Sequence, residues 1–569
     1  MALTPASGTL GLRRAELLLR RTTFCPSRED INFFAGLSVS QALDTLFNFD
    51  QTLPEPPIDP QTGTEWMTSG ATDANSEGFL RTRYFFAWQM NLMLKSNRSI
   101  QEKLVWFWHT HWTTSQQKVT NERALYFQNQ LFRYYAAGSF KDLSRKMCLD
   151  NAMLLFLDGR LNIDGVVNEN FARELLELYT VGKGPQDAED SYTYYSETDI
   201  QAAAKILTGY SNDDQFSNLD PDTGLPMGII RGGGDACFQH TIGDKTFSDI
   251  YGNATITTNP AEIVDSTGVT ADGMYSELDD LIELIFSQPI VNGTPRAAQF
   301  ICAELYRYFV HHEITGFDDD NYGPGTIMTD IIEPMAQVLV NNDYNIESAL
   351  RALLGSTYFL DTDNSSDDSD IVGGMIKSPL EITLGSLKLF NISLPEYETD
   401  LQGFYDSMLR GVHGVLERQG LPFYKPFEVA GYPAHHQTPT FDKSWITPNY
   451  LANRYNFTSV LFNPGGEDDP PFRLDVLDFI ENPANGITNP GDGQLLVTQL
   501  IDLLFPESVC AERIDYFVNE ILYGGLSTGA TMWQNDWNAY KSGGDPVAVV
   551  TQLEKLITAL IQTPEFQLN

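Results

Sequence analysis

Hydrophobic residues recur at intervals of three and four positions along most of this chain, which is the spacing of one face of an α-helix. Polar residues fill the intervening positions, so each stretch has one side suited to a core. This pattern predicts a mainly α fold, with one large multi-helix domain. The stretches predicted as helices are 12–22, 40–47, 79–112, 121–135, 168–179, 495–504, 510–523 and 547–561.

One further helix has a distinct start signal, the segment Ser378-Pro379-Leu380-Glu381. Serine is a favoured N-cap, proline fits the first helical position, and a glutamate three residues after the serine can bond back to the N-cap backbone. We expect this helix to continue to about Phe390. The pair Thr447-Pro448 predicts another helix start in the same way.

Strand signals are few and short. Residues 255–258 have the composition of a strand, and residues 229–231 and 238–241 together predict a small β-hairpin. Gly, Pro, Asp and Asn concentrate in irregular insertions whose length is typical of functional covers or of disordered segments. The insertions lie at about residues 48–78, 211–275 and 361–374.

The chain is expected to have two parts. Residues 8–462 form a main helical domain that carries the irregular insertions, and residues 495–569 form a C-terminal helical subdomain packed on it. No internal repeat is visible in the sequence. The β-structure is expected to amount to at most a small hairpin element.

The charge excludes some classes of partner. The chain has 36 basic and 76 acidic residues, a formal net charge of −40. Such a protein is repelled by phosphate backbones and by anionic lipid surfaces, so we expect no nucleic-acid partner. Its five cysteines form no CxxC motif, which argues against a disulfide framework and against a zinc ribbon.

No stretch of the sequence is apolar enough to span a membrane. Arg13-Arg14 precede only a short apolar run that Glu16 interrupts, so no signal peptide is predicted. The cytoplasm is therefore the default compartment. Export with a partner, or with a signal that has been removed, is the alternative.

Two histidines, His109 and His111, lie among four large aromatic residues on the predicted helix 79–112. Imidazoles in an apolar wall can transfer protons or bind zinc, iron or copper. Residues two apart point to different sides of a helix, so both can reach one ion only if the helix ends there. The sequence 113–115, Thr-Thr-Ser, allows such an end. The structural alternative is that one histidine bonds a core carbonyl while the other caps the helix.

The helix 168–179 carries a second group of candidates. Glu169 and Arg173 form an i, i+4 pair, while Asn170, Glu174 and Glu177 share an adjacent stripe. If that stripe is covered, two carboxylates three residues apart become a general base or a metal-ligand pair. If it is exposed, it is a solvated face.

His240 and Lys245 lie in the long polar insertion, close to Asp244 and after the flexible run 232–234. A single histidine in a polar loop is weak evidence for a site, and Asp244 and Lys245 are equally suited to a turn. His435-His436, in an aromatic and proline-rich loop, is an outside candidate. His311-His312 ends a predicted helix, where a favourable contact with the helix dipole explains it.

Other motifs are weaker. Residues 525–529 match G-x-S-x-G, but a helix precedes them where a nucleophile elbow needs a strand. Residues 318–320 and 361–363 begin like calcium loops without completing the pattern. Calcium bound in these acidic loops is a secondary expectation.

These segments together resemble a bacterial family known as domain of unknown function 1800. The matching pieces are Leu19 to Phe24, Trp108 to Trp112, Asn151 to Asp158, Asn168 to Gly182, Asp199 to Tyr210, His240 with Gly243 and Lys245, Ser378 to Glu381, Val429 to Pro433 with Trp445-Ile446, and Pro564 to Phe566.

The resemblance implies a mostly helical fold and brings no assigned activity. It also implies frequent gene neighbourhood with a second family that looks like alkaline phosphatases and sulfatases, so a protein of that family is an expected partner. The family pattern has recurrent polar positions, and the chain departs from it at Cys25, where glycine is usual, and at Thr241, where aspartate commonly follows the histidine. The recurrent positions are His109, His111, Asn168, Glu169, Asn170, Arg173, Glu174, His240 and Lys245.

The leading hypothesis is an enzyme in which the His109/His111 helix end, the helix 168–177 and the His240 loop converge on one pocket. Metal-assisted or acid–base hydrolysis is the guessed reaction, and a metal-dependent oxidoreductase is the secondary version. Glu174 or Glu169 is expected to act as the general base or as a ligand, and Arg173 to hold an anionic group. His111 or His240 is expected to transfer protons, and Lys245 completes the catalytic set. The expected metal ligands are His109, His111 and Glu174. The alternative is a non-catalytic structural or partner-binding scaffold. Homo-oligomers are a further expectation.

Overall fold

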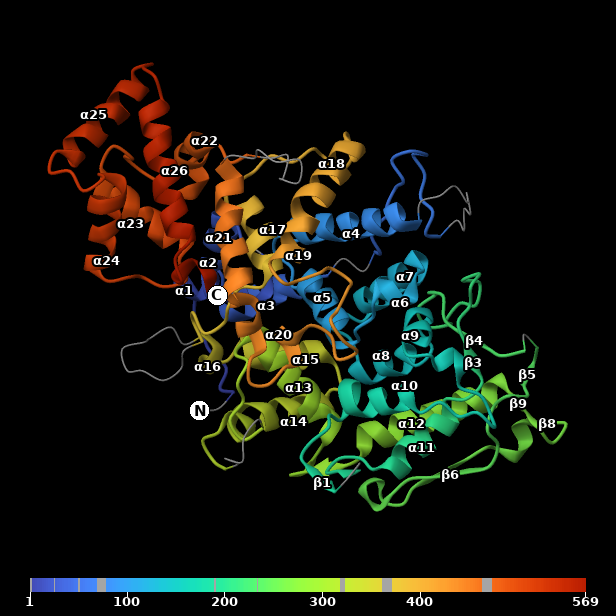
Figure 1. Cartoon of the computed structure of the whole chain (residues 1–569). Coiled ribbons are helices and arrows are strands. Elements are labelled where there is room, and N and C mark those ends of the chain that lie inside the picture. Colours follow the sequence, from blue (N-terminus) through green and yellow to red (C-terminus); the bar gives the residue numbers. More distant parts are fainter. Residues whose placement is uncertain are drawn as a thin grey trace.

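The computed structural model describes residues 3–24, 26–49, 52–68, 78–188, 191–232, 234–317, 323–360, 371–462 and 473–569. Helices dominate this part of the chain, and the strands form small antiparallel sheets of two or three strands (Figure 1). The mainly α fold predicted from the hydrophobic pattern is therefore confirmed. The expected calcium loops at 318–320 and 361–363, and the departure at Cys25, lie outside the described residues.

The first half of the chain is a succession of short and medium helices. These are α1 (Gly11–Thr22), α2 (Arg28–Ala35), α3 (Val39–Leu46), α4 (Gly78–Lys95), α5 (Gln101–His111), α6 (Gln116–Val119), α7 (Glu122–Tyr134), α8 (Phe140–Met147), α9 (Asn151–Phe156), α10 (Asn170–Glu174) and α11 (Glu197–Ile206). The apolar stretch predicted as a helix over 79–112 is two helices, because the chain leaves the helical path between Lys95 and Gln101.

The second half continues in the same way. Its helices are α12 (Ala271–Ser287), α13 (Arg296–Phe309), α14 (Glu333–Asn341), α15 (Ile346–Leu354), α16 (Thr357–Leu360), α17 (Pro379–Leu389), α18 (Leu401–Ser407), α19 (Gly414–Arg418), α20 (Pro433–His436), α21 (Pro448–Phe462), α22 (Val476–Glu481), α23 (Gly493–Leu504), α24 (Ala511–Tyr516), α25 (Gly529–Lys541) and α26 (Val547–Ile561). The start of α17 is the predicted capping box, in which the Ser378 side chain accepts from the Glu381 amide.

Short helical segments of other types connect these elements. The π-helical segments are η2 (Leu175–Thr180), η5 (Met328–Ile332), η6 (Met408–His413) and η9 (Phe517–Leu522). The 3₁₀ segments are η1 (Gly159–Leu161), η3 (Asp249–Tyr251), η4 (Pro260–Glu262), η7 (Phe441–Ile446), η8 (Pro483–Asn485) and η10 (Glu565–Gln567).

Most strands lie in the predicted irregular insertion near 211–275. The sheets pair β1 (Gln186–Ala188) with β2 (Ser191–Tyr192), β3 (Tyr210–Ser211) with β4 (Ile229–Ile230), β6 (Asp244–Thr246) with β7 (Thr255–Thr257), and β10 (Ile290–Val291) with β11 (Thr294–Pro295); β9 (Gly268–Thr270) lies between β5 (Ala236–Cys237) and β8 (Ile263–Val264).

The predicted hairpin between residues 229–231 and 238–241 is wrong. Ile229 and Ile230 pair with Ser211 and Tyr210, and Cys237 pairs with Val269. The strand predicted at 255–258 is confirmed as β7. The composition of the insertion therefore indicated strands, while their pairing depends on contacts distant in sequence.

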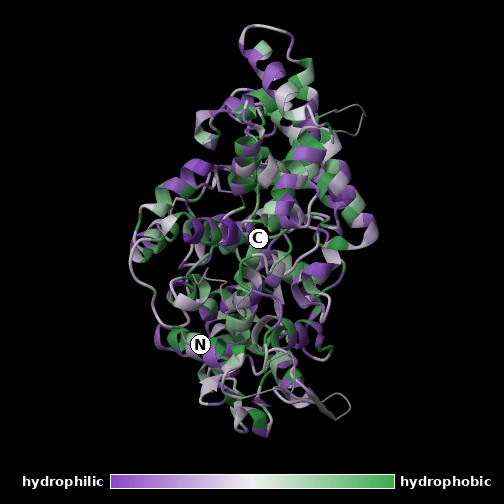
Figure 2. Ribbon diagram, turned by 90° about the vertical axis from the view of Figure 1, so that its left-hand side faces the viewer, coloured by the Kyte–Doolittle hydropathy of each residue, from purple (hydrophilic) through white to green (hydrophobic). Residues whose placement is uncertain are grey.

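The helices α23 to α26 gather at one end of the molecule, with α26 in contact with α21 (Figure 1). The division into a main domain at 8–462 and a subdomain at 495–569 stays a prediction. Hydrophilic and hydrophobic residues alternate around most helices, as amphipathic packing requires (Figure 2). Among the described residues, no helix has the length and apolar character needed to cross a membrane.

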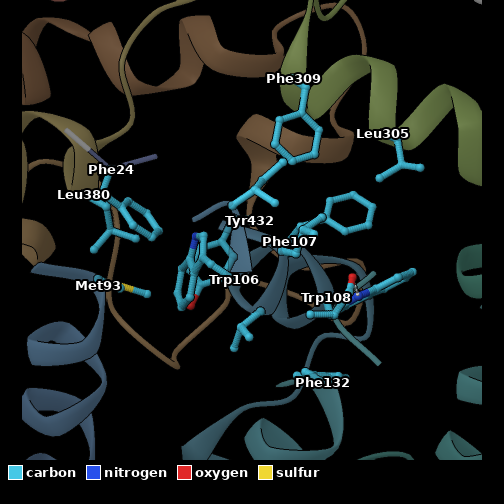
Figure 3. Packing of buried hydrophobic residues seen from close by; sticks show 14 of the residues in the cluster. Phe24, Met93, Trp106, Phe107, Trp108, Phe132, Leu305, Phe309, Leu380 and Tyr432 are labelled. Atoms are coloured by element: carbon cyan, nitrogen blue, oxygen red, sulfur yellow. Dashed lines mark hydrogen bonds between the residues drawn. The ribbon is translucent and has the colours of Figure 1, made fainter. Parts of the chain in front are cut away.

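The helix α5 lies in the interior, and every residue from Glu102 to Thr110 is buried. Its aromatic side chains contact elements that are distant in sequence (Figure 3). Trp106 stacks on Phe423 with 4.7 Å between ring centroids, and Phe107 packs edge-on against Tyr308 of α13 at 5.2 Å. Because such rings bury large apolar areas, α5 ties the first third of the chain to the last third.

Candidate functional site

A cavity of about 310 Å³ opens beside α5, in the size range of sites for small molecules. Its walls come from α5, the π-helical segment η2, α13, the start of α17, and the segment 430–445. The polar residues that line it include four of the chain's eight histidines. The charged and histidine residues of the lining are Lys103, His111, Glu177, Lys183, Glu304, Arg307, His312, Glu381, His435, His436 and Asp442.

One stripe of α5 forms a wall of the cavity. Lys103, Phe107 and His111 follow each other at intervals of four residues, so they share a face of the helix. Trp106 and Thr110 lie on the adjacent positions and also line the cavity. The same helix therefore buries one face in the core and presents another to the cavity.

Lys103 forms a buried ion pair with Glu381, with 2.5 Å between Nζ and Oε1. The Ser378 amide donates to the second oxygen of Glu381 at 2.6 Å. Burial alone would raise the pKa of Glu381, but the Lys103 ammonium and the hydrogen bonds from Lys103 and Ser378 hold it below its ordinary value. The Glu381 carboxylate is therefore ionised at neutral pH, and it is positioned by the first turn of α17.

His312 and Asp442 form a second pair at the cavity. Their Nδ1 and Oδ1 atoms are 3.3 Å apart, and the other oxygen of Asp442 accepts a hydrogen bond from the Ile376 amide at 2.8 Å. Both residues are buried, at 7% and 3% exposure. Within the described part of the chain, Oδ1 of Asp442 and both ring nitrogens of His312 make no aligned hydrogen bond, although Nε2 of His312 lies 3.4 Å from Oε1 of Glu313. Such atoms are costly to bury without a use.

His435 and His436, on α20, supply two more imidazoles to the lining. The Nε2 atoms of both are buried without an aligned hydrogen bond to any described residue, although Nε2 of His436 is 3.3 Å from Glu428. The His435 ring contacts Tyr308 and Trp445 at 5.6 and 5.5 Å. Burial lowers the pKa of His435 to about 3, so this ring is neutral at physiological pH.

The backbone around the cavity departs from regular geometry at two places. Glu177 and Leu178 line it from a π-helical segment. Such segments are rare in proteins overall, and those that occur are often found at functional sites. Phe441 lines it with φ +41°, a value that is strained for a bulky residue. Its ring lies 5.6 Å from the ring of His312. Strain of this kind persists only where the surrounding structure holds it.

The structure separates the two histidines of α5. His111 lines the cavity, and its Nε2 lies 2.9 Å from the Tyr179 carbonyl oxygen. His109 is fully buried in the core, stacked at 4.0 Å on Tyr424. Burial lowers the pKa of His109 to about 3 and that of His111 to about 4. The helix ends at His111, as the Thr-Thr-Ser sequence allowed, but the two rings have different neighbours.

The predicted metal ligands are not brought together. His109 does not line the cavity that His111 lines, and neither does Glu174. Across the described residues, no three His, Cys, Asp or Glu side chains are arranged to hold a metal ion. The geometry therefore gives no support to zinc, iron or copper at the set His109, His111 and Glu174.

Glu169 and Arg173 lie outside the cavity lining. Arg173 donates to both oxygens of Glu197, at 2.9 and 3.1 Å, and lies 3.6 Å from Glu169. This cluster joins α10 to α11 near the surface, where Arg173 is already occupied by protein carboxylates. The anion-holding role expected for Arg173 has no support in this arrangement.

Glu174 lies three residues before Glu177, which does line the cavity. Burial and then the charge of Glu177 raise its pKa to about 7, against opposing effects of Arg173 and Lys183. A carboxyl group with this pKa is suited to gain and lose protons near neutral pH. Glu177 itself contacts Lys183 at 2.9 Å and accepts from the Tyr195 hydroxyl at 2.6 Å.

His240 and Lys245 form a separate cluster in the insertion. His240 contacts the Thr208 carbonyl oxygen at 2.8 Å through Nδ1 and Glu277 at 3.2 Å through Nε2. Lys245 donates to Glu277 and to Thr258. All the side chains are buried, and neither His240 nor Lys245 lines the cavity. The predicted convergence of three segments is therefore wrong for this one, because the His240 loop turns its polar atoms inward onto Glu277.

Sequence reasoning missed most of the cavity. Lys103, Glu304, Arg307 and Asp442 were not predicted, Glu381 was interpreted only as a capping residue, and His312 only as a dipole contact. The spacing of Lys103, Phe107 and His111 was a signal in the sequence that could have placed Lys103 beside His111. No sequence signal related α5 to residues 430–445, which are more than 300 positions away.

The described part of the chain is therefore a mainly helical fold with a histidine-rich cavity, which is lined by residues between Lys103 and Trp445. The family model described as protein of unknown function (DUF1800) matches residues 17–568, so the chain belongs to this family. No curated protein and no solved structure matches the chain.

Proposed function

We propose that this protein is an enzyme whose acid–base chemistry takes place in the histidine cavity. The observation that carries the proposal is the His312–Asp442 pair. Both side chains are buried, they lie 3.3 Å apart, and several of their polar atoms have no aligned hydrogen bond within the described residues. Buried polar atoms of this kind usually have a catalytic or binding role, or an ordered water, to satisfy them.

The roles follow from the contacts. The Ile376 amide fixes one oxygen of Asp442, and the other oxygen faces Nδ1 of His312. A carboxylate beside an imidazole orients the ring in acid–base sites. In a hydrolysis, His312 accepts a proton from water as the water oxygen bonds to the substrate. The same imidazole then gives that proton to the leaving group as the scissile bond breaks.

A test compares turnover of a panel of p-nitrophenyl glycosides, esters and phosphates by the wild type and by Asp442→Asn. The substitution keeps the size of the side chain and removes its charge, so we expect the rate to fall by at least about 100-fold. Asp515→Asn, on the exposed face of α24, is the matched control and should keep the wild-type rate. Equal rates for wild type and Asp442→Asn, or no turnover of any probe, would contradict the proposal.

The scaffold alternative fits the other two clusters. The His240–Glu277–Lys245 network and the Arg173–Glu197 contacts have partners within the protein and lie outside the cavity. We propose that these residues stabilise helix packing and take no part in catalysis.

A further inference from the structure

The charges of the cavity are matched within its own lining. Each lysine or arginine of the lining contacts a carboxylate that also lines it. The pairs are Lys103 with Glu381, Lys183 with Glu177, and Arg307 with Glu304. The remaining acidic residue of the lining, Asp442, faces His312. A charged ligand that broke the buried Lys103–Glu381 pair would leave one of these charges buried without its partner, which is costly.

Two buried arginines, Arg21 and Arg454, lie behind this lining without being part of it. Arg21 donates to backbone carbonyl groups, including that of Val310, and Arg454 donates to the carbonyl groups of Trp445 and Lys377. Both act electrostatically on Glu381 and Asp442. Their positive charges therefore act on these two carboxylates from within the protein.

His111 and His435 do not add charge at neutral pH. Burial lowers the pKa of His435 to about 3 and that of His111 to about 4. A neutral imidazole has one nitrogen that donates and one that accepts a hydrogen bond. The ring of His435, whose buried Nε2 atom has no aligned bond to a described residue, can therefore act as a donor or as an acceptor.

Aromatic side chains complete the lining. Trp106 and Phe107 come from α5, Tyr308 from α13, and Phe441 and Trp445 from η7. The ring of His435 contacts the rings of Tyr308 and Trp445, so its unpartnered nitrogen lies in an aromatic environment. A ligand that fits this arrangement has an apolar face and an edge of groups that both donate and accept hydrogen bonds.

We infer that the cavity binds a neutral saccharide ring. The C–H groups of a pyranose form an apolar face, its hydroxyl groups both donate and accept, and it carries no charge. This inference names the substrate class of the proposed enzyme and rests on that proposed function. A nucleobase also has flat faces, but it usually arrives with phosphates, which the chain's net charge of −40 repels.

The binding test uses saturation-transfer NMR together with tryptophan fluorescence, because Trp106 and Trp445 line the cavity. The probes are methyl β-glucoside, cellobiose and chitobiose as neutral saccharides, glucuronate and glucosamine as charged analogues, and adenosine. We expect at least one neutral saccharide to bind and to change the fluorescence. Its charged analogue should bind about tenfold more weakly, the equivalent of ~1.4 kcal/mol.

His435→Phe is the informative variant, since it keeps a ring of similar size and removes the unpartnered nitrogen. We expect saccharide affinity to fall by about tenfold or more, as in other sites where a buried polar group loses a ligand hydroxyl. The folded protein should be at least as stable as the wild type, which separates loss of binding from loss of structure. Tyr516→Ala, an exposed aromatic on α24, is the control and should bind like the wild type.

Failure of this inference is distinguishable from failure of the proposed function. Binding of adenosine or a charged probe in preference to every neutral saccharide, or binding of none of the probes, overturns the saccharide assignment. Turnover of a non-saccharide ester that Asp442→Asn abolishes would then still support the enzyme. Saccharide binding that His435→Phe weakens, without any turnover, supports the inference and overturns the enzyme.

Discussion

Two clusters of histidine, carboxylate and lysine occur in this protein, and they differ in what their polar atoms contact. In the His240 cluster, both imidazole nitrogens and the Lys245 ammonium have protein partners. In the cavity, nitrogens of His312 and His435 have no aligned partner among the described residues, and a volume of about 310 Å³ lies beside them. Residue type alone does not define a site. The difference lies in whether the fold has already satisfied the nitrogen atoms. Oε1 of Glu277 in the His240 cluster is itself buried without an aligned hydrogen bond to a described residue.

The largest expected effect on stability belongs to the His240 cluster. Glu277→Gln keeps the shape of the side chain but leaves the buried Lys245 without its counter-charge, so we expect the free energy of unfolding to fall by about 3–5 kcal/mol. Chemical denaturation at neutral pH measures it. An unchanged denaturation midpoint would show that the His240 cluster does not stabilise the fold, and this would contradict the structural role proposed for it.

Removing a buried polar group from the cavity should raise the free energy of unfolding. His435→Phe removes a buried nitrogen that has no aligned partner, so we expect a gain of ~1 kcal/mol at pH 7. Burial keeps this ring neutral down to about pH 3, whereas the unfolded chain takes up a proton below the ordinary value of 6.5.

Wild-type stability therefore falls as the pH drops through that window, by at most ~1.4 kcal/mol per pH unit for this group. The advantage of His435→Phe should grow between pH 6 and pH 4. Denaturation curves at several pH values measure it. A variant that is less stable than the wild type throughout would indicate that His435 has a structural role.

Glu174 tests whether the surroundings of the cavity raise the pKa of a nearby carboxyl group. Its pKa is raised from 4.5 to about 7, so the native protein holds a proton there that the unfolded chain has already released. This group costs stability increasingly as the pH rises from 4.5 to 7, and Glu174→Gln should remove that cost. We expect a relative gain of a fraction of ~1 kcal/mol that appears only above about pH 5, because the group is partly solvated. A carboxyl titration by NMR near pH 4.5 would contradict this.

The smallest effect is expected for Arg173. Its side chain is about one third exposed where it contacts Glu197 and Glu169. Exposed ion pairs contribute little, so Arg173→Ala should cost less than ~1 kcal/mol and leave turnover unchanged. A loss of turnover in this variant would indicate that Arg173 and its partners Glu169 and Glu197 take part in catalysis.

The sequence predicted the helices well and the site only in part. Periodicity and the capping box at Ser378 depend on residues within a few turns, so they can be read locally. His111 was found because it stands in an unusual aromatic context. The partners Glu381, His312 and Asp442 come from three later segments, and only tertiary packing brings them to α5. The expected partner protein and self-association stay predictions.

The most direct test of the account compares two isosteric substitutions in one assay. Asp442→Asn and Glu277→Gln each remove one buried carboxylate charge, one from the cavity and one from the His240 cluster. For any probe that the wild type turns over, we expect Asp442→Asn to lose at least about 100-fold in rate while staying folded. Folded Glu277→Gln should keep the wild-type rate per folded molecule. A rate that survives Asp442→Asn and is lost in folded Glu277→Gln would place the chemistry at His240 and contradict the account.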